Sequence, residues 1–257
     1  MKYHYQRSKQ KKWPVIVLFI IGILIGSLAT YYYFTTYYYK PVQTSSQTYT
    51  PVTEPLSSHV EINLVAVDQD GNGVSTPLIV ESKPGNGKTL TNIEKLLFWT
   101  DTQQSIQIAK YVAENLTEIN ASSYDLTYSI ESDATVIGGP SAGAALTIAT
   151  IAALRNERIR NDVVITGTIN GDGTIGEIGG VLEKAKAAKD AGAELFLVPL
   201  GQGEQTFLKP QETCTKRGNL IFCRTTYQAV TVNIGQETGI SVLEVGSIGD
   251  AYKYFKL

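Results

Sequence analysis

The feature that most constrains this chain is an uncharged stretch that runs from Trp13 to Tyr39. Its apolar part reaches Phe34 and is long enough to cross a bilayer, for which about 20 residues suffice. Residues 1–12 carry five basic side chains and no acid, and tyrosines crowd the far end of the stretch. Basic flanks stay in the cytoplasm and aromatic rings favour the membrane interfaces. We therefore expect a basic cytoplasmic tip at residues 1–12 and a single transmembrane helix at residues 13–34 in the lipid bilayer of the cell membrane.

This topology places the rest of the chain outside the cytoplasm. The segment Ser27-Leu28-Ala29 resembles a signal-peptide cleavage site, so a cleaved signal peptide is the alternative to an anchor. In both cases the C-terminal domain is extracytoplasmic. Residues 35–59 are rich in Tyr, Ser, Thr and Pro and show no apolar periodicity, which indicates an extended stalk.

Residues 60–257 have the patterns of one folded domain in which strands and helices interleave. Alternating or short apolar runs predict strands, and apolar residues at helical spacing predict helices. The fold class is therefore α/β or α+β. The predicted strands are 60–67, 77–81, 124–130, 162–166, 194–199 and 240–245, and the predicted helices are 102–116, 142–154, 181–191 and 247–255.

Composition excludes several kinds of site. Without the five basic residues of the tip, 17 basic residues face 24 acidic ones, so the body is a poor binder of nucleic acid. Two His and two Cys are too few for a multi-His or Cys₄ metal site, and we expect neither metal nor cofactor. Cys214 and Cys223 flank Gly218-Asn219, which could form a hairpin turn. In an oxidising compartment they could form a disulfide, and two separate buried thiols are the alternative.

The segment Gly85-Asn-Gly-Lys-Thr89 invites comparison with a nucleotide-binding phosphate loop. That pattern needs a glycine five positions before the Gly of Gly-Lys-Thr, and Ser82 stands there. We expect a polar loop between strands instead, and no other ATPase signature is present in the sequence.

A second glycine-rich segment, Gly138-Gly-Pro-Ser-Ala-Gly143, opens directly into the apolar helix at 142–154. A serine at a helix N-terminus lies near backbone N–H groups that favour negative charge, so Ser141 is a candidate nucleophile. The amides near Gly139 and Ser141 are candidate donors to an oxyanion. Because His4 and His59 lie outside the predicted domain, we do not expect a Ser-His-Asp triad.

Lysine is the main alternative base if burial lowers its pKa. In Gly179-Gly-Val-Leu-Glu-Lys-Ala-Lys-Ala-Ala188, helical geometry places Lys184 on the same face as Val181 and Ala188. Lys186 points elsewhere. On periodicity alone, a surface lysine whose stem packs on the apolar face is a competing interpretation.

These segments resemble the proteolytic domain of the Lon protease family. Its nucleophile lies in a Gly-Pro-Ser-Ala-Gly motif and its base in a Gly-Gly-x-x-x-Lys motif, which here implies Ser141 and Lys184. Thr166-Gly167 is similar to a family segment whose threonine orients the lysine, and the segment 83–90 is similar to an early polar loop of the family. The resemblance covers residues 60–255 and implies a mixed sheet with packed helices, polypeptide substrates and assembly into a homo-oligomeric ring, often a hexamer in this family.

The chain also departs from this pattern. Many Lon enzymes have an acid three positions before the serine, where Gly138 stands here, and the family's ATPase module is missing from the sequence. The arrangement resembles the membrane-anchored archaeal Lon-like proteins that lack this module. It implies a membrane-anchored serine endopeptidase with a Ser-Lys dyad and no ATPase in cis. The alternative is a Lon-like binding or assembly module, tethered to the membrane and without turnover.

Overall fold

The structure is a computed structural model, and it describes residues 22, 24–33, 57–92, 100–130 and 139–257. The chain divides into two units, residues 1–48 and 49–257. In the first unit, residue 22 and residues 24–33 are helical. Within the described ranges, no helix is both long and apolar enough to cross a membrane. Residues 1–12, half of the predicted span at 13–34 and nearly all of the predicted stalk lie outside the described residues.

The first sheet of the second unit has four strands in the order β1-β2-β4-β3. They are β1 (Ser58–Val67), β2 (Gly73–Pro84), β4 (Tyr124–Ile130) and β3 (Thr89–Asn92). β1, β2 and β4 pair antiparallel, and β3 is parallel to β4. Alternate residues of β4 are buried, which is the pattern that predicted this strand. β1 begins two residues earlier than predicted, at Ser58.

The loop at residues 85–88 connects β2 and β3, as expected for a polar loop between strands. The backbone N–H groups of Asn86 and Lys88 both donate to Oδ1 of Asp125, each at 2.9 Å. These two hydrogen bonds lower the pKa of Asp125. The loop therefore wraps around a carboxylate of its own chain, and these two amides are not free to bind a phosphate.

The second sheet has three parallel strands in the order β11-β8-β5. They are β5 (Val163–Ile165), β8 (Leu195–Pro199) and β11 (Ser241–Val245). A two-stranded pair, β6 (Thr168–Ile169) and β7 (Ile175–Gly176), lies between β5 and the next helix along the chain. The helices of the domain are α2 (Thr100–Thr117), α3 (Gly143–Arg155), α4 (Val181–Asp190), α5 (Ile234–Thr238) and α6 (Ile248–Phe255), with short 3₁₀ turns η1 (Ala121–Ser123) and η2 (Pro140–Ala142).

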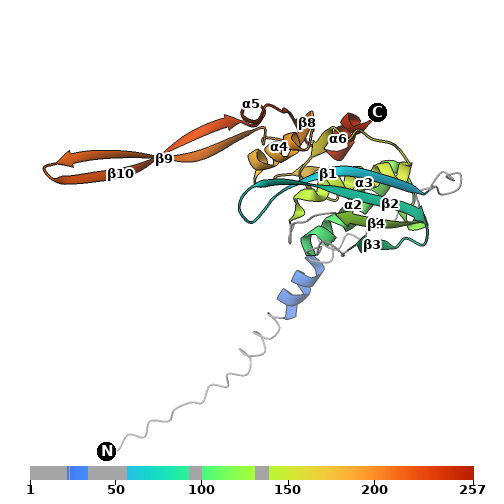
Figure 1. Cartoon of the computed structure of the whole chain (residues 1–257). Coiled ribbons are helices and arrows are strands. Elements are labelled where there is room, and N and C mark those ends of the chain that lie inside the picture. The colour runs from blue at the N-terminus through green and yellow to red at the C-terminus, as the bar shows by residue number, and fades with distance from the viewer. Residues whose placement is uncertain (1–21, 23, 34–56, 93–99, 131–138) are drawn as a thin grey trace, which may run out of the picture. The chain divides into compact units, whose positions relative to one another are not determined.

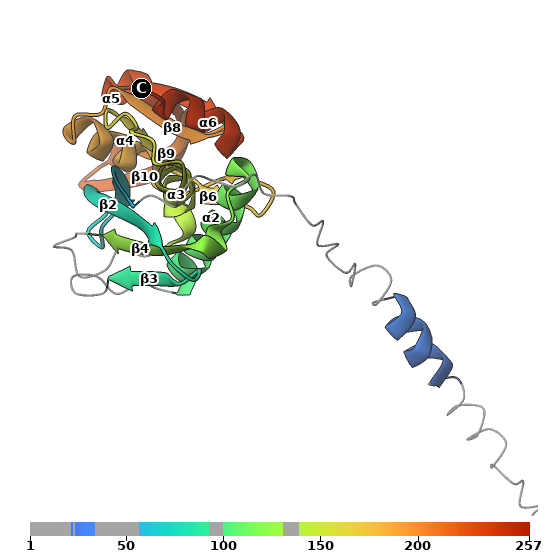
Figure 2. The same cartoon turned by 90° about the vertical axis from the view of Figure 1, so that its right-hand side faces the viewer.

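Helix α3 forms the centre of the domain. Every residue from Gly143 to Leu154 is buried, and the helix contacts α2, β1, β2, β5 and α6. Figure 2 shows α3 among the strands of the first sheet, α2 and the elements of the second sheet. A helix that is apolar on all sides has to be enclosed in this way. The mixed α/β class expected from the sequence is confirmed.

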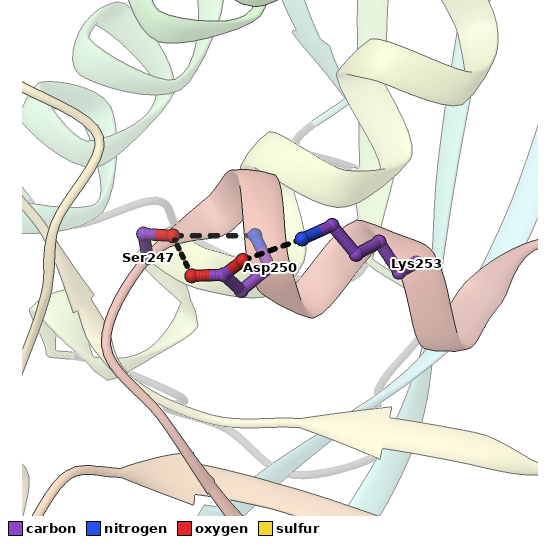
Figure 3. A network of polar contacts seen from close by, with 3 residues as sticks. All are labelled: Ser247, Asp250 and Lys253. Carbon is purple, nitrogen blue, oxygen red and sulfur yellow. Dashed lines mark hydrogen bonds and ion pairs between the residues drawn. The ribbon is translucent and has the colours of Figure 1, made fainter.

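Helix α6 is held at its N-terminus by a small polar network (Figure 3). Oγ of Ser247 accepts the backbone N–H of Asp250 at 3.2 Å and lies 2.9 Å from its Oδ2. Nζ of Lys253 donates to Oδ1 of the same aspartate at 2.6 Å. The bonds from Lys253 and Ser247 lower the pKa of Asp250. The network caps the helix that carries Ile248 and Phe255 into the core.

A long β-hairpin projects from the rest of the second unit (Figure 1). Its strands are β9 (Glu204–Arg217) and β10 (Leu220–Asn233), joined by a turn at Gly218-Asn219. Cys214 and Cys223 are opposite each other and form a disulfide. The sequence indicated the turn, but not that the hairpin has 14 residues in each strand. Most of these residues are exposed, so the hairpin buries no face that an apolar alternation could reveal.

Candidate active site

Ser141 lies in η2, at the junction between Gly139 and the start of α3. Gly139 has φ +119°, a conformation that side chains disfavour, and this turns the chain into the helix. A Cβ at Gly143 would lie 2.5 Å from Cγ2 and 2.9 Å from the backbone N of Ile169. Both glycines of the motif are therefore required by the path of the backbone, which presents Ser141 half-buried at the N-terminus of α3.

The backbone of Ser141 is fixed by the segment that follows β5. Its carbonyl accepts the N–H of Gly167 at 2.9 Å and the hydroxyl of Thr166 at 3.3 Å. The N–H of Ala144 in turn donates to the carbonyl of Gly167 at 3.0 Å. We expected the hydroxyl of Thr166 to orient Lys184. In the structure its hydrogen bond goes to the carbonyl of Ser141, so buried Thr166 contacts the backbone of Ser141 and not Lys184.

Lys184 lies in the first turn of α4 with only 4% of its surface exposed. Val181, Ala185 and Ala188 are buried around it, whereas Lys186 is exposed, as helical periodicity predicted. Nζ of Lys184 donates to Oγ of Ser141 at 2.9 Å. Desolvation by burial lowers the pKa of Lys184 from 10.5 to about 8, because the charged ammonium is disfavoured there. The lysine is therefore able to reach its neutral form near physiological pH.

Contacts that the sequence did not reveal hold α4 in place. A Cβ at Gly73, the first residue of β2, would lie 1.9 Å from the carbonyl oxygen of Glu183. A Cβ at Gly180 would lie 2.6 Å from Cγ2 of Val67, the last residue of β1. The first turn of α4 thus rests directly on the end of the β1–β2 hairpin. A glycine that makes room for another backbone leaves no periodic signal, and only its position before a strand could have suggested it.

The segment before α4 is held by a side chain from another loop. The amide of Gln202 donates to the carbonyl of Ile178 at 2.8 Å and accepts its N–H at 3.0 Å. This pair of bonds satisfies both backbone groups of Ile178 as a neighbouring strand would. Gln202 therefore fixes the approach to Gly179-Gly180 and the start of the helix that carries Lys184.

The site offers no carboxylate or imidazole cluster for a metal among the residues that the structure describes. Within that part of the chain, one group of possible ligands lies close together, namely Glu212, Cys214 and Cys223 on the hairpin. Its two sulfurs are joined in the disulfide and cannot act as thiolate ligands. The backbone amides of Gly139 and Ser141 belong to the 3₁₀ turn η2 and its N-cap, which lead into α3. They are close in sequence to the Ser141 hydroxyl.

A serine at a helix N-terminus, within hydrogen-bonding distance of a buried amine, is the kind of site that serine hydrolases use. Comparison with known proteins agrees. Residues 89–246 match the family described as the Lon protease (S16) C-terminal proteolytic domain. Since the match covers more than half of the chain, this protein belongs to that family. The family expectation from the sequence motifs is confirmed.

Individual relatives show how the chain compares with full-length Lon proteases. It is 34% identical over 137 residues to Lon protease of Methylocella silvestris, which covers 52% of this chain and 17% of the relative. It is 28% identical over 158 residues to archaeal Lon protease of Thermococcus kodakarensis, covering 59% and 24%. With Lon protease 2 of Bacillus subtilis it shares 41% identity over 73 residues, covering 28% and 13%. The matched region thus spans less than a quarter of each relative.

Proposed function

We propose that this chain is a serine endopeptidase in which Ser141 is the nucleophile and Lys184 the general base. The observation that carries the proposal is the 2.9 Å separation of Nζ of Lys184 and Oγ of Ser141. It is supported by the burial that lowers the pKa of Lys184 to about 8. A positioned base within hydrogen-bonding distance and with a pKa near neutrality is what activation of a serine hydroxyl needs.

In the proposed reaction, neutral Lys184 takes the proton of the Ser141 hydroxyl as Oγ attacks the peptide carbonyl. The amides of Gly139 and Ser141 would stabilise the oxyanion. Protonated Lys184 then donates to the leaving amine, and the C–N bond breaks to leave an acyl-enzyme, which water hydrolyses. Thr166 and Gly167 contribute by holding the carbonyl of Ser141, so that Oγ keeps its position while bonds form and break.

The proposal extends to setting and substrate. We propose that residues 13–34 anchor the chain in a membrane with the domain on the extracytoplasmic side, which the basic residues before this segment support. The substrates would be polypeptides, and by analogy with the family the domain would assemble into a homo-oligomeric ring. No phosphate loop is present in the 257 residues, so the proposed cleavage would need neither cofactor nor ATP hydrolysed by these residues.

A serine-directed fluorophosphonate probe tests the dyad. We expect the parent protein to be labelled, and Ser141→Ala and Lys184→Ala to lose labelling and peptide cleavage. Two matched controls should keep both: Ser247→Ala removes a serine from another helix N-terminus, and Lys186→Ala removes an exposed lysine of the same helix.

The same experiment separates the proposal from its alternative. A folded parent protein that neither binds the probe nor cleaves an unstructured polypeptide would favour a non-catalytic Lon-like binding or assembly module. Labelling that survives Ser141→Ala would show that the nucleophile lies elsewhere.

A further inference from the structure

The end of the β9–β10 hairpin has an unusual distribution of side chains. Three consecutive apolar residues, Leu220, Ile221 and Phe222, directly follow the turn and are 64%, 68% and 55% exposed. Successive residues of a strand point to opposite faces. Leu220 and Phe222 therefore lie on one face and Ile221 on the other. We refer to residues 213–224 as the hairpin tip.

Charge at the hairpin tip has a single sign. From Thr213 to Arg224 the sequence contains three basic residues and no acid. Lys216 and Arg224 are both exposed. Lys216 pairs with Ile221 across the hairpin, and Arg224 lies two residues after Phe222 on β10. Of the two acids of the hairpin, Glu204 lies at its base, and Glu212 lies in the residue pair next to the tip, with a carboxylate oxygen within 4.8 Å of the disulfide sulfurs. The basic charge and the apolar side chains thus coincide at the end of the hairpin, while the rest of the hairpin is mixed in charge.

The hairpin tip is also covalently fastened. The disulfide joins β9 and β10 at the fourth residue pair from the turn, with a sequence separation of 9. A two-stranded hairpin without a core is at best marginally stable in water. The disulfide keeps the two strands of the tip paired although the tip buries no apolar face. Its exposed triplet is therefore held in a defined position.

From these observations we propose that the hairpin tip inserts into the surface of a bilayer that contains anionic phospholipids. A protein partner that docks on one face of the hairpin would cover Ile221 or the pair Leu220 and Phe222, but not all three. A lipid surface that receives the hairpin end-on surrounds both faces at once. Basic residues beside inserted apolar side chains complement anionic headgroups. This lipid contact is separate from the proposed anchor at residues 13–34 and independent of the proposed peptidase activity.

The test places a fluorescent reporter at the hairpin tip of the full chain. Phe222→Trp is compared with Tyr227→Trp, whose exposed position lies five residues further along β10, about 16 Å from the first at strand spacing. Each variant is mixed with vesicles that contain anionic lipid and brominated acyl chains, which quench tryptophan at membrane depth. The parent protein is measured in parallel for the background of its two native tryptophans. Leu220→Trp provides a second reporter at the tip.

We expect the indole introduced by Phe222→Trp to be quenched several-fold more strongly than the one introduced by Tyr227→Trp. Adding Lys216→Glu and Arg224→Glu should reduce quenching of the tip reporter to the level of the reporter at position 227. Adding Lys209→Glu instead, nearer the base of the hairpin, should leave quenching of the tip reporter unchanged.

Equal quenching of the reporters at positions 222 and 227, or equal quenching with purely zwitterionic lipid, would overturn the proposal. So would a blue shift of the tip reporter that depends on protein concentration without quenching, because it would indicate contact between copies. Fluorophosphonate labelling of each variant reports separately on the active site.

Discussion

The site around Ser141 and the β9–β10 hairpin are built on opposite principles. At the site, Thr166 is 1% and Lys184 4% exposed, and the geometry is fixed by contacts from four different segments of the chain. On the hairpin nearly every residue is exposed, and one disulfide joins its strands near the tip. The pKa of Lys184 therefore depends on burial, which a single substitution can remove, whereas the hairpin depends on local bonds alone.

The largest effect is expected where burial and chemistry coincide. Lys184→Met keeps the length and apolar stem of the side chain but removes the amine. We expect peptide cleavage to fall by at least about a thousandfold, because the substitution removes the proposed base that hydrogen-bonds to Ser141. At pH 7 the same variant should be more stable than the parent, by up to about 3 kcal/mol, since the parent buries a charge that would be better solvated when unfolded.

The sign of this stability difference can be checked against pH. Between pH about 8 and 10.5 the unfolded lysine is protonated and the folded one is neutral, so the parent gains stability as pH rises through this window. Denaturant unfolding at pH 7 and pH 10 should show the advantage of Lys184→Met shrinking. Lys186→Met, on the exposed face of α4, is the matched control. It should change neither peptide cleavage nor the way the free energy of unfolding depends on pH. If Lys184→Met were less stable than the parent at pH 7, the hydrogen bond from Lys184 to Ser141 would stabilise the fold by more than desolvation of the ammonium destabilises it.

A smaller effect is expected from the backbone contact beneath α4. Gly73→Ala would place Cβ 1.9 Å from the carbonyl oxygen of Glu183, and no side-chain rotation can relieve that contact. The first turn of α4 must shift, and Lys184 with it. We expect cleavage to fall about tenfold to a hundredfold, since displacing a catalytic group by about 1 Å has effects of this size. Steady-state kinetics on a peptide measures this.

The control for Gly73→Ala is Gly249→Ala, where an added Cβ meets nothing within 4 Å. That variant should cleave at the parent rate. If Gly73→Ala also retained the parent rate, the end of the β1–β2 hairpin would not determine the position of Lys184, and the packed site would be more tolerant than its contacts suggest.

Burial also explains why the sequence predicted the elements around the site better than the hairpin. The segments 124–130, 142–154 and 181–191 were placed within one or two residues, because one face or all of each element is buried and leaves a periodic pattern. The side chains of Ser141 and Lys184 were singled out by glycine-flanked motifs. The strands of the hairpin were missed, since a strand with no buried face carries no such pattern.

Other features of the site were beyond sequence reasoning for a different reason. The contact of Gly73 with Glu183, the bonds from Gln202 to Ile178 and the bond from Thr166 to the carbonyl of Ser141 all involve backbone groups. Backbone atoms are the same in every residue, so such contacts are specified by the three-dimensional path of the chain. They become visible only once the fold is known.

A further prediction concerns the pH dependence of activity. Because the proposed base works as a neutral amine with a pKa of about 8, kcat/KM on an uncharged peptide should rise about tenfold from pH 7 to pH 9. Circular dichroism over the same range should show an unchanged fold. A profile that is flat, or that rises only near pH 10, would mean that Lys184 is not the titrating base.

The smallest effect on activity is expected from the hairpin. In Cys214→Ser/Cys223→Ser the strands lose the disulfide, whose two cysteines are separated by 9 positions in the sequence. A disulfide that closes a loop of this length stabilises the folded state by about 2–3 kcal/mol. Because the hairpin tip lies outside the packed core, this loss should remain local. Peptide cleavage should stay within twofold of the parent, while limited proteolysis of the same double variant in a Ser141→Ala background should cut within residues 204–233 much faster. A comparable fall in cleavage would show instead that the hairpin and the site behave as one cooperative unit, and the contrast between a buried site and a locally stabilised hairpin would fail.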